Sequence, residues 1–558
     1  MPNNKTATIY CKNSNSYHDF PLGTSLAEIL SKINLQLPNK IVAARVNCKV
    51  EDLNFLVYKP KDIEFLDTTS IEGMRVYINT LSMIFGKAVS ELYPNTLVKI
   101  EFPISHGYYC HLINFKKTVS LAEVQAIKQR MKEIIAQDKT IISEEKQRET
   151  VQELFAKLPN QDDKLKLFDS LGNKYLRYFR IDDYLDYYNG VLMPSTSYVQ
   201  LFDLQAYDNG ILLLGTNADN PSKLEDLAPE PKILEVSKEF YKMNEHLNIN
   251  SVGELNKQFL TNKSFSLIKI AEALHEKKLV SIVDAIAKKR KKIKFILVSG
   301  PSSSGKTTFS KRLAIQLVLA GFKPEIISLD NYFLNRQDTP RDANGDWDFE
   351  SIYALDLPLY KQQLQQLLAG ETVEMPSFSF EDGKRYFKGE KLHLQKNSII
   401  IMEGIHALNP ELLPDIPEHV LYKIYVSALS TISLDNHNWI STFDTCLLRR
   451  IIRDFRFRNY SAQETIKRWA SVRRGGEKWI YPFSQYADVV FNSSLAFELA
   501  VLKKHAEPIL DEVPEYCEEY TEACRLKNFL NYFVSIPERE IPPTSLLREF
   551  IGGSSFKY

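Results

Sequence analysis

A glycine-rich loop set between an apolar strand and a helix constrains the fold more than any other feature of this sequence. Residues 300–307 read GPSSSGKT, a full match to the pattern GxxxxGK[ST]. The apolar run at 295–298 predicts a buried parallel strand, and the helical spacing of apolar residues after the loop predicts a helix that stops at Gly321. Backbone N–H groups of such a loop surround a polyphosphate, and the helix start adds partial positive charge. The predicted nucleotide-binding residues are Gly300, Pro301, Ser302, Ser303, Ser304, Gly305, Lys306, Thr307 and Thr308.

Chemically active side chains stand in this loop and after the next two predicted strands. Lys306 is placed to reach the β- and γ-phosphates, and Thr307 is placed to ligate Mg²⁺. Asp330 ends a short strand, where a carboxylate can take the proton of an alcohol that attacks the γ-phosphoryl group; an ordinary turn or helix-capping aspartate is the alternative. Glu403 ends the apolar run at 398–402, where an acidic residue holds Mg²⁺ directly or through water. Together they predict phosphoryl transfer from ATP, with Mg²⁺, to a hydroxyl.

The composition limits the class of protein. A chain of 558 residues with 44% apolar and 25% charged residues predicts a soluble globular protein of several domains. Its 70 basic and 70 acidic residues cancel, so no net charge draws it to nucleic acid or to an anionic membrane. The N-terminus lacks the apolar core of a signal peptide, no apolar run is long enough to span a bilayer, and the six cysteines form no CxxC pair. We therefore expect a cytoplasmic protein with reduced thiols and no membrane segment; the sequence leaves a homo-oligomer open.

Residues 1–70 have the pattern of a small β-rich module with one helix. The stretch VNCKVEDLNFLVYKPKDIEFLD resembles the TGS domain, a ubiquitin-like β-grasp fold attached to threonyl-tRNA synthetases and some GTPases. The segment supplies no catalytic group. We therefore expect an accessory or docking module.

Residues 73–220 contain INTLSMIFGKAVSELYP, PISHGYYCHL and DDYLDYYNGVLMPS, which together resemble the second additional domain of threonyl- and alanyl-tRNA synthetases. The resemblance implies an α+β fold in which three histidines and one cysteine bind zinc and support hydrolytic editing of mischarged tRNA. None of the residues at these four positions is a zinc ligand of the expected kind. The residues are Met83, Lys87, Tyr188 and Leu192. We therefore expect that the editing chemistry is absent and that the scaffold binds RNA, a substrate or a partner.

Three further residues of this region, His106, Cys110 and His111, suggest a metal site by their closeness in sequence. Alternation along a strand places Cys110 and His111 on opposite faces, which disfavours shared ligation. Residues 221–292 show helical periodicity and predict a helical connector, whose basic run at 288–292 fits a solvated helix end better than a nucleic-acid patch. Residues 511–558 predict a tail that begins with a helix.

An arginine-rich helix is predicted in DTCLLRRIIRDFRFRNYSAQETIKRWASVRRGG. Its arginines exceed what a surface helix needs, and interleaved apolar residues give it one buried face. Arginines aimed at a triphosphate would neutralise charge that develops during transfer, whereas surface salt bridges are the alternative for any one of them. The arginines are Arg449, Arg450, Arg453, Arg458, Arg473 and Arg474.

Taken in order, GPSSSGKTTF, SLDNYF, IIIMEGI, DTCLLRRIIRD and QYADVVFNSS resemble the uridine kinase and phosphoribulokinase family over residues 293–510. The architecture is most similar to long bacterial uridine-type nucleoside kinases, in which two synthetase-like modules precede this core. The resemblance implies an α/β core with a P-loop NTPase-type doubly wound parallel sheet, and transfer from ATP to the 5′-hydroxyl of a nucleoside such as uridine or cytidine. The implied roles are Asp330 as general base, Lys306, Thr307 and Glu403 for ATP and magnesium, Glu350 (or Asp348) for ribose hydroxyls, Arg453 for ribose or phosphates, and Arg458 in a mobile lid.

The base-binding segment departs from the family pattern P-x-Y-D-F-x-x-H-x-R. Its tyrosine, aspartate and histidine positions are Phe378, Ser379 and Gly383, and the aromatic residue after the catalytic aspartate is Phe333 in place of tyrosine. Stacking surfaces remain, but most hydrogen-bonding groups are lost, which relaxes discrimination. The substrate-binding residues that the resemblance implies are Asp330, Phe333, Glu350, Phe378, Phe380, Arg385 and Arg453. A nucleoside kinase is favoured; a kinase of a sugar, sugar phosphate or other polyol, and an RNA- or ribosome-associated regulator with a nucleotide switch, are the alternatives.

Overall fold

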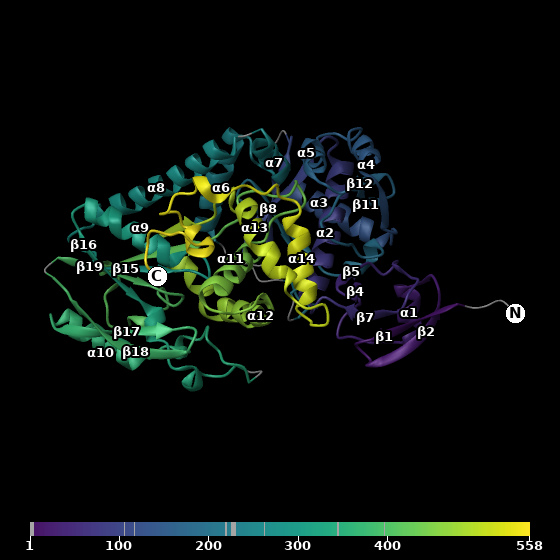
Figure 1. Ribbon diagram of the computed structural model, residues 1–558. Coiled ribbons are helices and arrows are strands. Elements are labelled where there is room, and N and C mark those ends of the chain that lie inside the picture. The colour runs from purple at the N-terminus through teal and green to yellow at the C-terminus, as the bar shows by residue number, and fades with distance from the viewer. Residues whose placement is uncertain are drawn as a thin grey trace. The chain divides into compact units, whose positions relative to one another are not determined.

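The computed structural model describes residues 5–104, 107–115, 118–217, 220–224, 230–261, 263–342, 345–395 and 397–558. The chain forms two compact units, each with its own buried core (Figure 1). The first unit contains residues 1–230, 244–258 and 432–441, and the second contains residues 231–243, 259–431 and 442–558. Over the described residues, no helix combines the length and apolarity needed to cross a bilayer.

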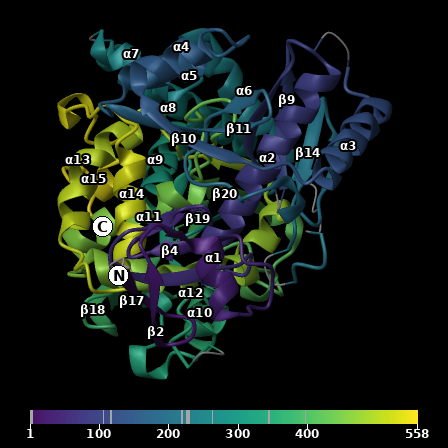
Figure 2. The ribbon, with the colours of Figure 1, turned by 90° about the vertical axis from the view of Figure 1, so that its right-hand side faces the viewer.

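The first unit begins with a β-grasp arrangement of a mixed sheet and one helix, drawn in purple in Figure 2. The strand order is β2-β1-β7-β4-β5, with β1 and β7 parallel. The strands are β1 (Thr6–Cys11), β2 (Ser16–Pro21), β4 (Ala43–Val46), β5 (Lys49–Glu51) and β7 (Lys61–Leu66), with the short pair β3 (Thr24–Ser25) and β6 (Leu56–Val57) beside them. Ser25 caps α1 (Leu26–Ile33) in a capping box with Glu28. Alternate side chains of β1 and β7 build the core of this module.

The rest of the first unit is an α+β layer around one long, mostly buried helix, α2 (Ile71–Leu92). An antiparallel sheet of order β13-β14-β9-β8 packs with it. Its strands are β8 (Leu97–Ile104), β9 (Gly107–Ile113), β13 (Asp203–Tyr207) and β14 (Gly210–Leu214). A second sheet holds β10 (Ile142–Gln147), β11 (Tyr175–Ile181) and β12 (Tyr184–Asp186). The helices are α3 (Leu121–Ala136), α4 (Arg148–Phe155), α5 (Asp162–Ser170) and α7 (Val252–Leu260, whose last two residues belong to the second unit).

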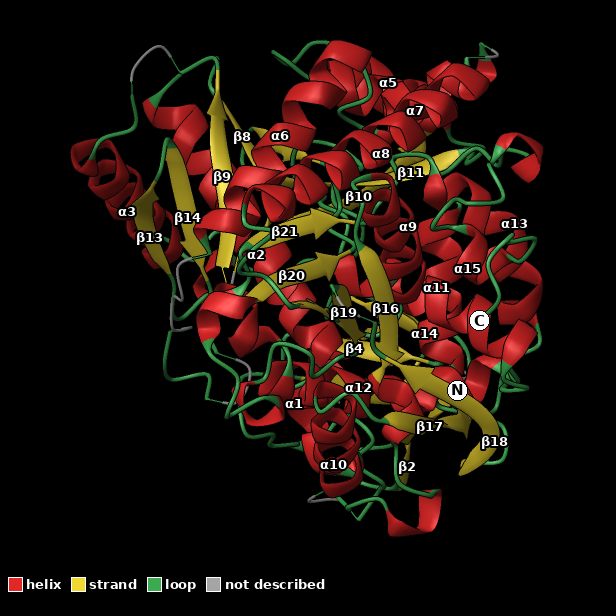
Figure 3. Ribbon diagram, turned by 90° about the vertical axis from the view of Figure 1, so that its left-hand side faces the viewer, coloured by secondary structure: helices red, strands yellow, loops and turns green. Residues whose placement is uncertain are grey.

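The second unit is built on a fully parallel sheet of order β16-β19-β15-β20-β21 (Figure 3). Its strands are β15 (Phe295–Ser299), β16 (Lys323–Ser328), β19 (Ser398–Glu403), β20 (Leu421–Ser427) and β21 (Val489–Asn492). β15 is buried along its whole length, as its apolar run requires. A hairpin of β17 (Thr372–Ser379) and β18 (Lys384–His393) stands apart from this sheet. The predicted α/β class with a parallel kinase-type sheet is confirmed.

Helices of the second unit complete its layers. They are α6 (Pro231–Leu247, whose last turn belongs to the first unit), α8 (Ser264–Lys288), α9 (Lys306–Leu319), α10 (Leu357–Leu368), α11 (Thr442–Phe457), α12 (Ala462–Trp479), α13 (Glu498–Asp511), α14 (Tyr520–Leu530) and α15 (Arg548–Ile551). The arginine-rich segment, expected as one helix, forms two. Asn459 takes a left-handed conformation with φ 54°, and Ser461 then caps α12 together with Glu464.

Candidate functional site

The glycine-rich loop connects β15 to α9, as the sequence predicts. A side chain at Gly300 would place its Cβ 2.0 Å from the Val426 carbonyl oxygen, so only glycine fits there. Gly305 caps α9 with φ +85°, in the left-handed region that glycine favours. Lys306 Nζ donates to the Pro301 carbonyl at 3.0 Å and therefore lies over the loop. The hydroxyls of Ser303 and Ser304 are buried and have no hydrogen-bond partner among the described residues, which leaves them free for an anion.

Glu403 and Asp330 lie beside the loop because the parallel strands end together. Ser328 at the end of β16 and Val298 in β15 are both in register with Glu403 at the end of β19. Glu403 Oε1 accepts hydrogen bonds from Ser328 Oγ at 2.8 Å and from Thr307 Oγ1 at 3.3 Å. Burial, with the charge of Asp330 close by, raises the pKa of Glu403 to about 7.

The donor set here fits Mg²⁺. The Thr307 hydroxyl and the Glu403 carboxylate offer hard oxygen ligands, and Asp330 adds a second carboxylate near them. The residues that the structure describes contain no group of three or more His, Cys, Asp or Glu side chains placed to hold an ion. A magnesium ion here would thus take the rest of its ligands from water and from a nucleotide's phosphates, as is usual for this ion.

Glu350 is a third acid in this cluster. Its side chain is buried, and its Oε2 atom has no hydrogen-bond partner within the described part of the chain. Burial raises its pKa, while the charges of Arg450 and Lys306 oppose that rise. Helix α12 packs closely on it, since a Cβ on Gly475 would lie 2.2 Å from the Glu350 Cβ. Glu350 therefore lies within electrostatic reach of the loop, with an oxygen free to accept a hydrogen bond.

Three arginines of α11 and the turn after it share one carboxylate, Asp454. Arg450 and Arg453 pair with Asp454 at 3.2 and 2.8 Å, and Arg458 approaches it at 3.7 Å. Although burial opposes it, Arg453, Arg450 and Arg458 lower the pKa of Asp454 to about 2. Burial, with Arg453 nearby, lowers the pKa of Arg458 to about 9. One carboxylate cannot balance three guanidinium groups, so this side of the site carries excess positive charge.

The six arginines divide by what they contact. Arg450 Nη1 donates to Ser302 Oγ in the glycine-rich loop at 2.9 Å. Arg449 is fully buried; it pairs with Glu498 at 2.5 Å and supports the loop through the Ser303 carbonyl. Arg473 and Arg474 pair with Glu477 and Asp342, for which the surface-salt-bridge interpretation holds.

An aromatic cluster stands next to Asp330. Phe333, Phe378 and Phe380 lie with ring centroids 5.2 to 6.1 Å apart, and the Arg458 guanidinium lies 3.8 Å from the Phe380 ring centroid. Arg385 on β18 pairs with Asp356 at 2.9 Å. The structure thus joins the predicted aromatic residues and Arg458 into one wall.

One contact at the loop gives no signal in the sequence. Glu549 of α15 accepts hydrogen bonds from the N–H and hydroxyl groups of Thr308, although the two residues are 241 positions apart. No motif marks the tail.

The first unit contains a different buried cluster. Lys164 Nζ and His437 Nδ1 pair with the two oxygens of Asp186 at 2.9 and 2.5 Å, and Asp435 accepts from the backbone N–H of His437 at 2.8 Å. Burial raises the pKa of Asp435 to about 6. Tyr188, at one of the four positions where the resemblance implies a zinc ligand, stacks on His437 with ring centroids 6.0 Å apart.

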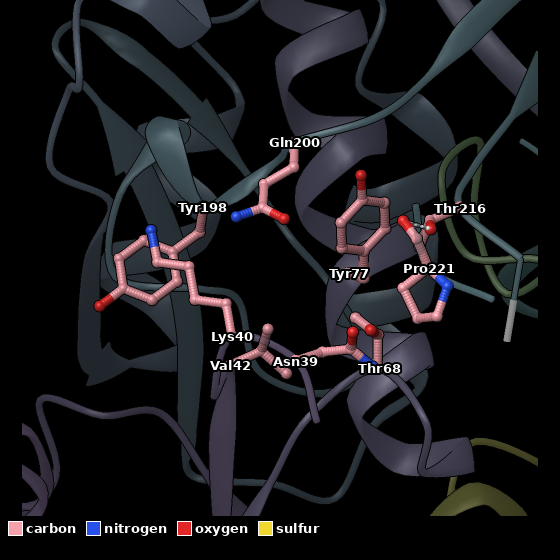
Figure 4. A pocket seen from close by; sticks show the side chains of 9 residues that line it. All are labelled: Asn39, Lys40, Val42, Thr68, Tyr77, Tyr198, Gln200, Thr216 and Pro221. Atoms are coloured by element: carbon pink, nitrogen blue, oxygen red, sulfur yellow. Dashed lines mark hydrogen bonds between the residues drawn. The ribbon is translucent and has the colours of Figure 1, made fainter. Parts of the chain in front are cut away.

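The residues at the other three positions where the resemblance implies a zinc ligand are also buried: Met83, Lys87 and Leu192. Cys110 faces the core and His111 is partly exposed, while His106 lies outside the described residues. A pocket elsewhere in this unit, between Tyr77, Tyr198 and Gln200, offers about 20 Å³ (Figure 4). That is room for about one water molecule, too little for a nucleotide or an amino acid.

Two regions of the chain are similar to different known proteins. The Phosphoribulokinase / Uridine kinase family matches residues 295–498. Residues 295–498 form a domain of that family. The uridine kinase of Halobacterium salinarum is 27% identical over 215 residues, which cover 38% of this chain and 86% of that protein. The uridine kinase of Ligilactobacillus salivarius is 29% identical over 223 residues, covering 39% of this chain and 95% of that protein.

The N-terminal region is similar to threonine–tRNA ligases. The ligase of Ligilactobacillus salivarius is 28% identical over 190 residues, which cover 34% of this chain and 29% of that protein. The chain therefore spans less than a third of the length of the ligases that it matches. The predicted resemblance to both families is confirmed.

Proposed function

We propose that this protein is an ATP-dependent kinase that transfers the γ-phosphoryl group to a hydroxyl of a small molecule. The first candidate is the 5′-hydroxyl of a nucleoside such as uridine or cytidine. The observation that carries this proposal is the meeting of the glycine-rich loop, Lys306, Asp330 and Glu403 at the carboxyl end of one parallel sheet. The family domain and the relatives named uridine kinases support it.

Each residue has a distinct part in the proposed reaction. Loop amides and Lys306 bind the donor's phosphates, and Arg453 and Arg458 neutralise charge that builds up on the transferred group. Asp330 accepts the proton of the acceptor hydroxyl. The hydroxyl oxygen then bonds to the γ-phosphorus while the bond between the γ-phosphorus and the β–γ bridging oxygen breaks. A magnesium ion held by Thr307 and Glu403 would screen the phosphates. Glu350 accepts hydrogen bonds from other hydroxyls of the acceptor.

The wall that Phe333, Phe378, Phe380 and Arg458 form beside Asp330 suits a flat group of the acceptor. Phe333, Phe378 and Phe380 offer stacking surface for a base. A side chain at Gly383 would bring its Cβ within 2.8 Å of Arg336 Nε, so a base-reading histidine at 383 would require Arg336 to move. Arg336 donates to the Phe380 carbonyl at 3.3 Å and to the Tyr460 hydroxyl at 3.1 Å. The absence of a base-reading side chain at position 383 supports a second candidate: a sugar or another polyol as acceptor.

A panel assay separates these candidates. The purified protein is mixed with ATP, Mg²⁺ and single nucleosides, pentoses, hexoses or other polyols, and mass spectrometry detects which compound gains a phosphate. Uridine or cytidine phosphorylation supports the first candidate, and sugar phosphorylation supports the second. Slow ATP hydrolysis without any phosphorylated product would refute both and would favour an RNA- or ribosome-associated regulator.

The similarity of the N-terminal region to threonine–tRNA ligases motivates that regulator as the remaining alternative, with RNA contact through the first unit. Co-purification of tRNA or ribosomes with the full chain is its distinguishing result. All six cysteines are free thiols in the structure, which supports the cytoplasm as the compartment we propose.

A further inference from the structure

The C-terminal residues of the second unit lie on the first turn of α9. Glu549 Oε2 accepts hydrogen bonds from the Thr308 N–H at 3.1 Å and from Thr308 Oγ1 at 2.6 Å. The Tyr558 hydroxyl lies 2.7 Å from Thr308 Oγ1, and Lys311 Nζ lies 4.9 Å from the Tyr558 ring centroid. Figure 1 shows the yellow C-terminus beside α9 and β15. The tail thus closes on the start of the helix that follows the glycine-rich loop.

The donors on Thr308 are those that a phosphate needs. The first hydrogen bond within α9 runs from the Phe309 N–H to the Gly305 carbonyl, so the Thr308 N–H has no partner inside the helix. A helix start of this kind binds anions, and in a glycine-rich loop the same amides receive the α- and β-phosphates of a nucleotide. Glu549 is therefore an internal anion at a place that nucleotide phosphates also require.

Charge makes the two occupants compete further. Glu549 is one of the negative charges that act on Glu403, so it stands close to the acidic side of the site. A bound triphosphate would bring more negative charge to the same place. Carboxylate and phosphate cannot both accept from Thr308 without strong repulsion.

The tail is anchored at its base by buried apolar side chains, whereas polar contacts with α9 hold its tip. Leu546, Leu547 and Phe550 are buried, and a Cβ on Gly305 would lie 2.3 Å from Leu546 Cδ2. Arg456 donates to the Ile551 carbonyl at 2.9 Å. In contrast, Tyr558 is 61% exposed. Displacement of Glu549 thus needs a change of its side-chain rotamer and release of the last residues, not unfolding of the tail.

We propose that Glu549 is a tethered competitor of the nucleotide. In the free protein it occupies the first turn of α9, and nucleotide binding displaces its side chain together with residues 552–558. This inference rests on the nucleotide site of the proposed function. The tail thereby lowers the apparent affinity for ATP by the fraction of molecules in which the site is open.

Titration calorimetry with ATP and with inorganic triphosphate tests this competition. Glu549→Ala should bind both about tenfold more tightly, because a hydrogen-bonded charge that must be displaced is removed, and Glu549→Gln should show a smaller gain in the same direction. Glu540→Gln, a carboxylate of the same tail that pairs with Arg539, is the matched control and should bind as the wild type does. Thermal melting without nucleotide verifies that the variants are folded.

Lys306→Ala separates the two ways in which the experiment can fail. If Lys306→Ala does not weaken ATP binding, the nucleotide site itself is refuted. If Lys306→Ala weakens binding but the Glu549 variants bind equally or less tightly than wild type, the competition alone is overturned.

Hydrogen exchange in the unaltered protein gives a second test that needs no folded variant. The Ser555 N–H donates to the Pro543 carbonyl at 2.9 Å in the closed tail. Added ATP should speed exchange in residues 552–558. Slower exchange there would mean that the tail closes over the nucleotide, which would contradict displacement.

Discussion

Each unit of this protein buries a group of charged side chains, but the two groups differ in how completely their members are paired. In the first unit, Lys164 and His437 both pair with Asp186, and all three side chains are buried. In the second unit, the acids near the loop stand close together, and Glu350 keeps an oxygen without a partner among the described residues. Removing one partner from a paired, closed cluster leaves an uncompensated buried charge, whereas acids that lack partners, as in an open cluster, mark a candidate ligand site.

The cluster of the first unit draws its residues from two distant stretches of the chain. Residues 432–441, which lie in sequence between β20 and α11, belong to the first unit and bring Asp435 and His437 into its cluster. Asn438 donates from its side chain to the Tyr187 carbonyl at 3.0 Å and to Asp435 at 2.7 Å. Hydrogen bonds among its own residues thus hold the cluster together.

The largest expected effect concerns the open cluster. Asp330→Asn should lower phosphoryl transfer on the order of 10²–10⁴-fold, because the amide cannot accept the acceptor's proton. Rapid-quench measurement of a single turnover, with the acceptor found in the panel assay, gives the rate of phosphoryl transfer. Asp338→Asn, an exposed aspartate in the next turn, is the control and should transfer at the wild-type rate. Normal transfer by Asp330→Asn would remove the general base from the mechanism.

The next effect concerns the closed cluster. Lys164→Met should lower the free energy of unfolding of the first unit by about 3–5 kcal/mol, because it leaves the buried Asp186 carboxylate with His437 as its one ion-pair partner among the described residues. Lys166→Met on the same helix is the control; its pair with Glu254 is partly exposed and should be worth about 0–1 kcal/mol. Hydrogen exchange of α5 and β12 in rising urea reports both. Equal effects of the two substitutions would mean that the cluster is not a stabilising element.

A smaller effect is a pH dependence of the open cluster. Glu403 has a pKa of about 7, and its ionised form is the one that binds the ion. Affinity for Mg²⁺-ATP should therefore increase with increasing pH, by up to about tenfold per pH unit, until about pH 7 and stay constant above it. Asp330→Asn should shift this profile to lower pH, because it removes a charge that raises the pKa. Calorimetry between pH 5.5 and 8.5 measures the profile, and a flat profile would show that Glu403 does not hold the ion.

The same shift affects stability with a defined sign. The pKa of Glu403 is raised above its ordinary value of 4.5, so the protonated form is favoured in the folded state. Its contribution to stability is present below pH 4.5 and is lost as the pH rises from about 4.5 to about 7. Glu403→Gln should therefore raise the melting temperature more at pH 8 than at pH 5. The reverse order would contradict the pKa assignment.

Local patterns predicted much of the second unit. The buried strand, the glycine-rich loop, the start of α9 and the acid at the end of β19 follow from contiguous residues, and each is found. The break between α11 and α12 depends on the left-handed conformation of a single residue, Asn459, within a strongly helical pattern. The periodicity of the sequence therefore predicted one helix where there are two.

Long-range partners could not be predicted in the same way. Glu549 contacts Thr308 across 241 residues, and Arg449 finds Glu498 across 49. His437 joins Asp186 across more than two hundred positions, inside a unit other than the one its sequence neighbours form. A single sequence has no periodicity that connects such residues; only the folded chain brings them together.

The central claim is a division of labour, in which Lys306 holds the donor and Asp330 prepares the acceptor. Its most direct test is the affinity for ATP of Lys306→Ala and Asp330→Asn, measured side by side at pH 8, where Glu403 is ionised. The account predicts that Lys306→Ala loses about tenfold or more in affinity while Asp330→Asn stays within about twofold of the wild type. An equal loss of ATP affinity in both variants would contradict it.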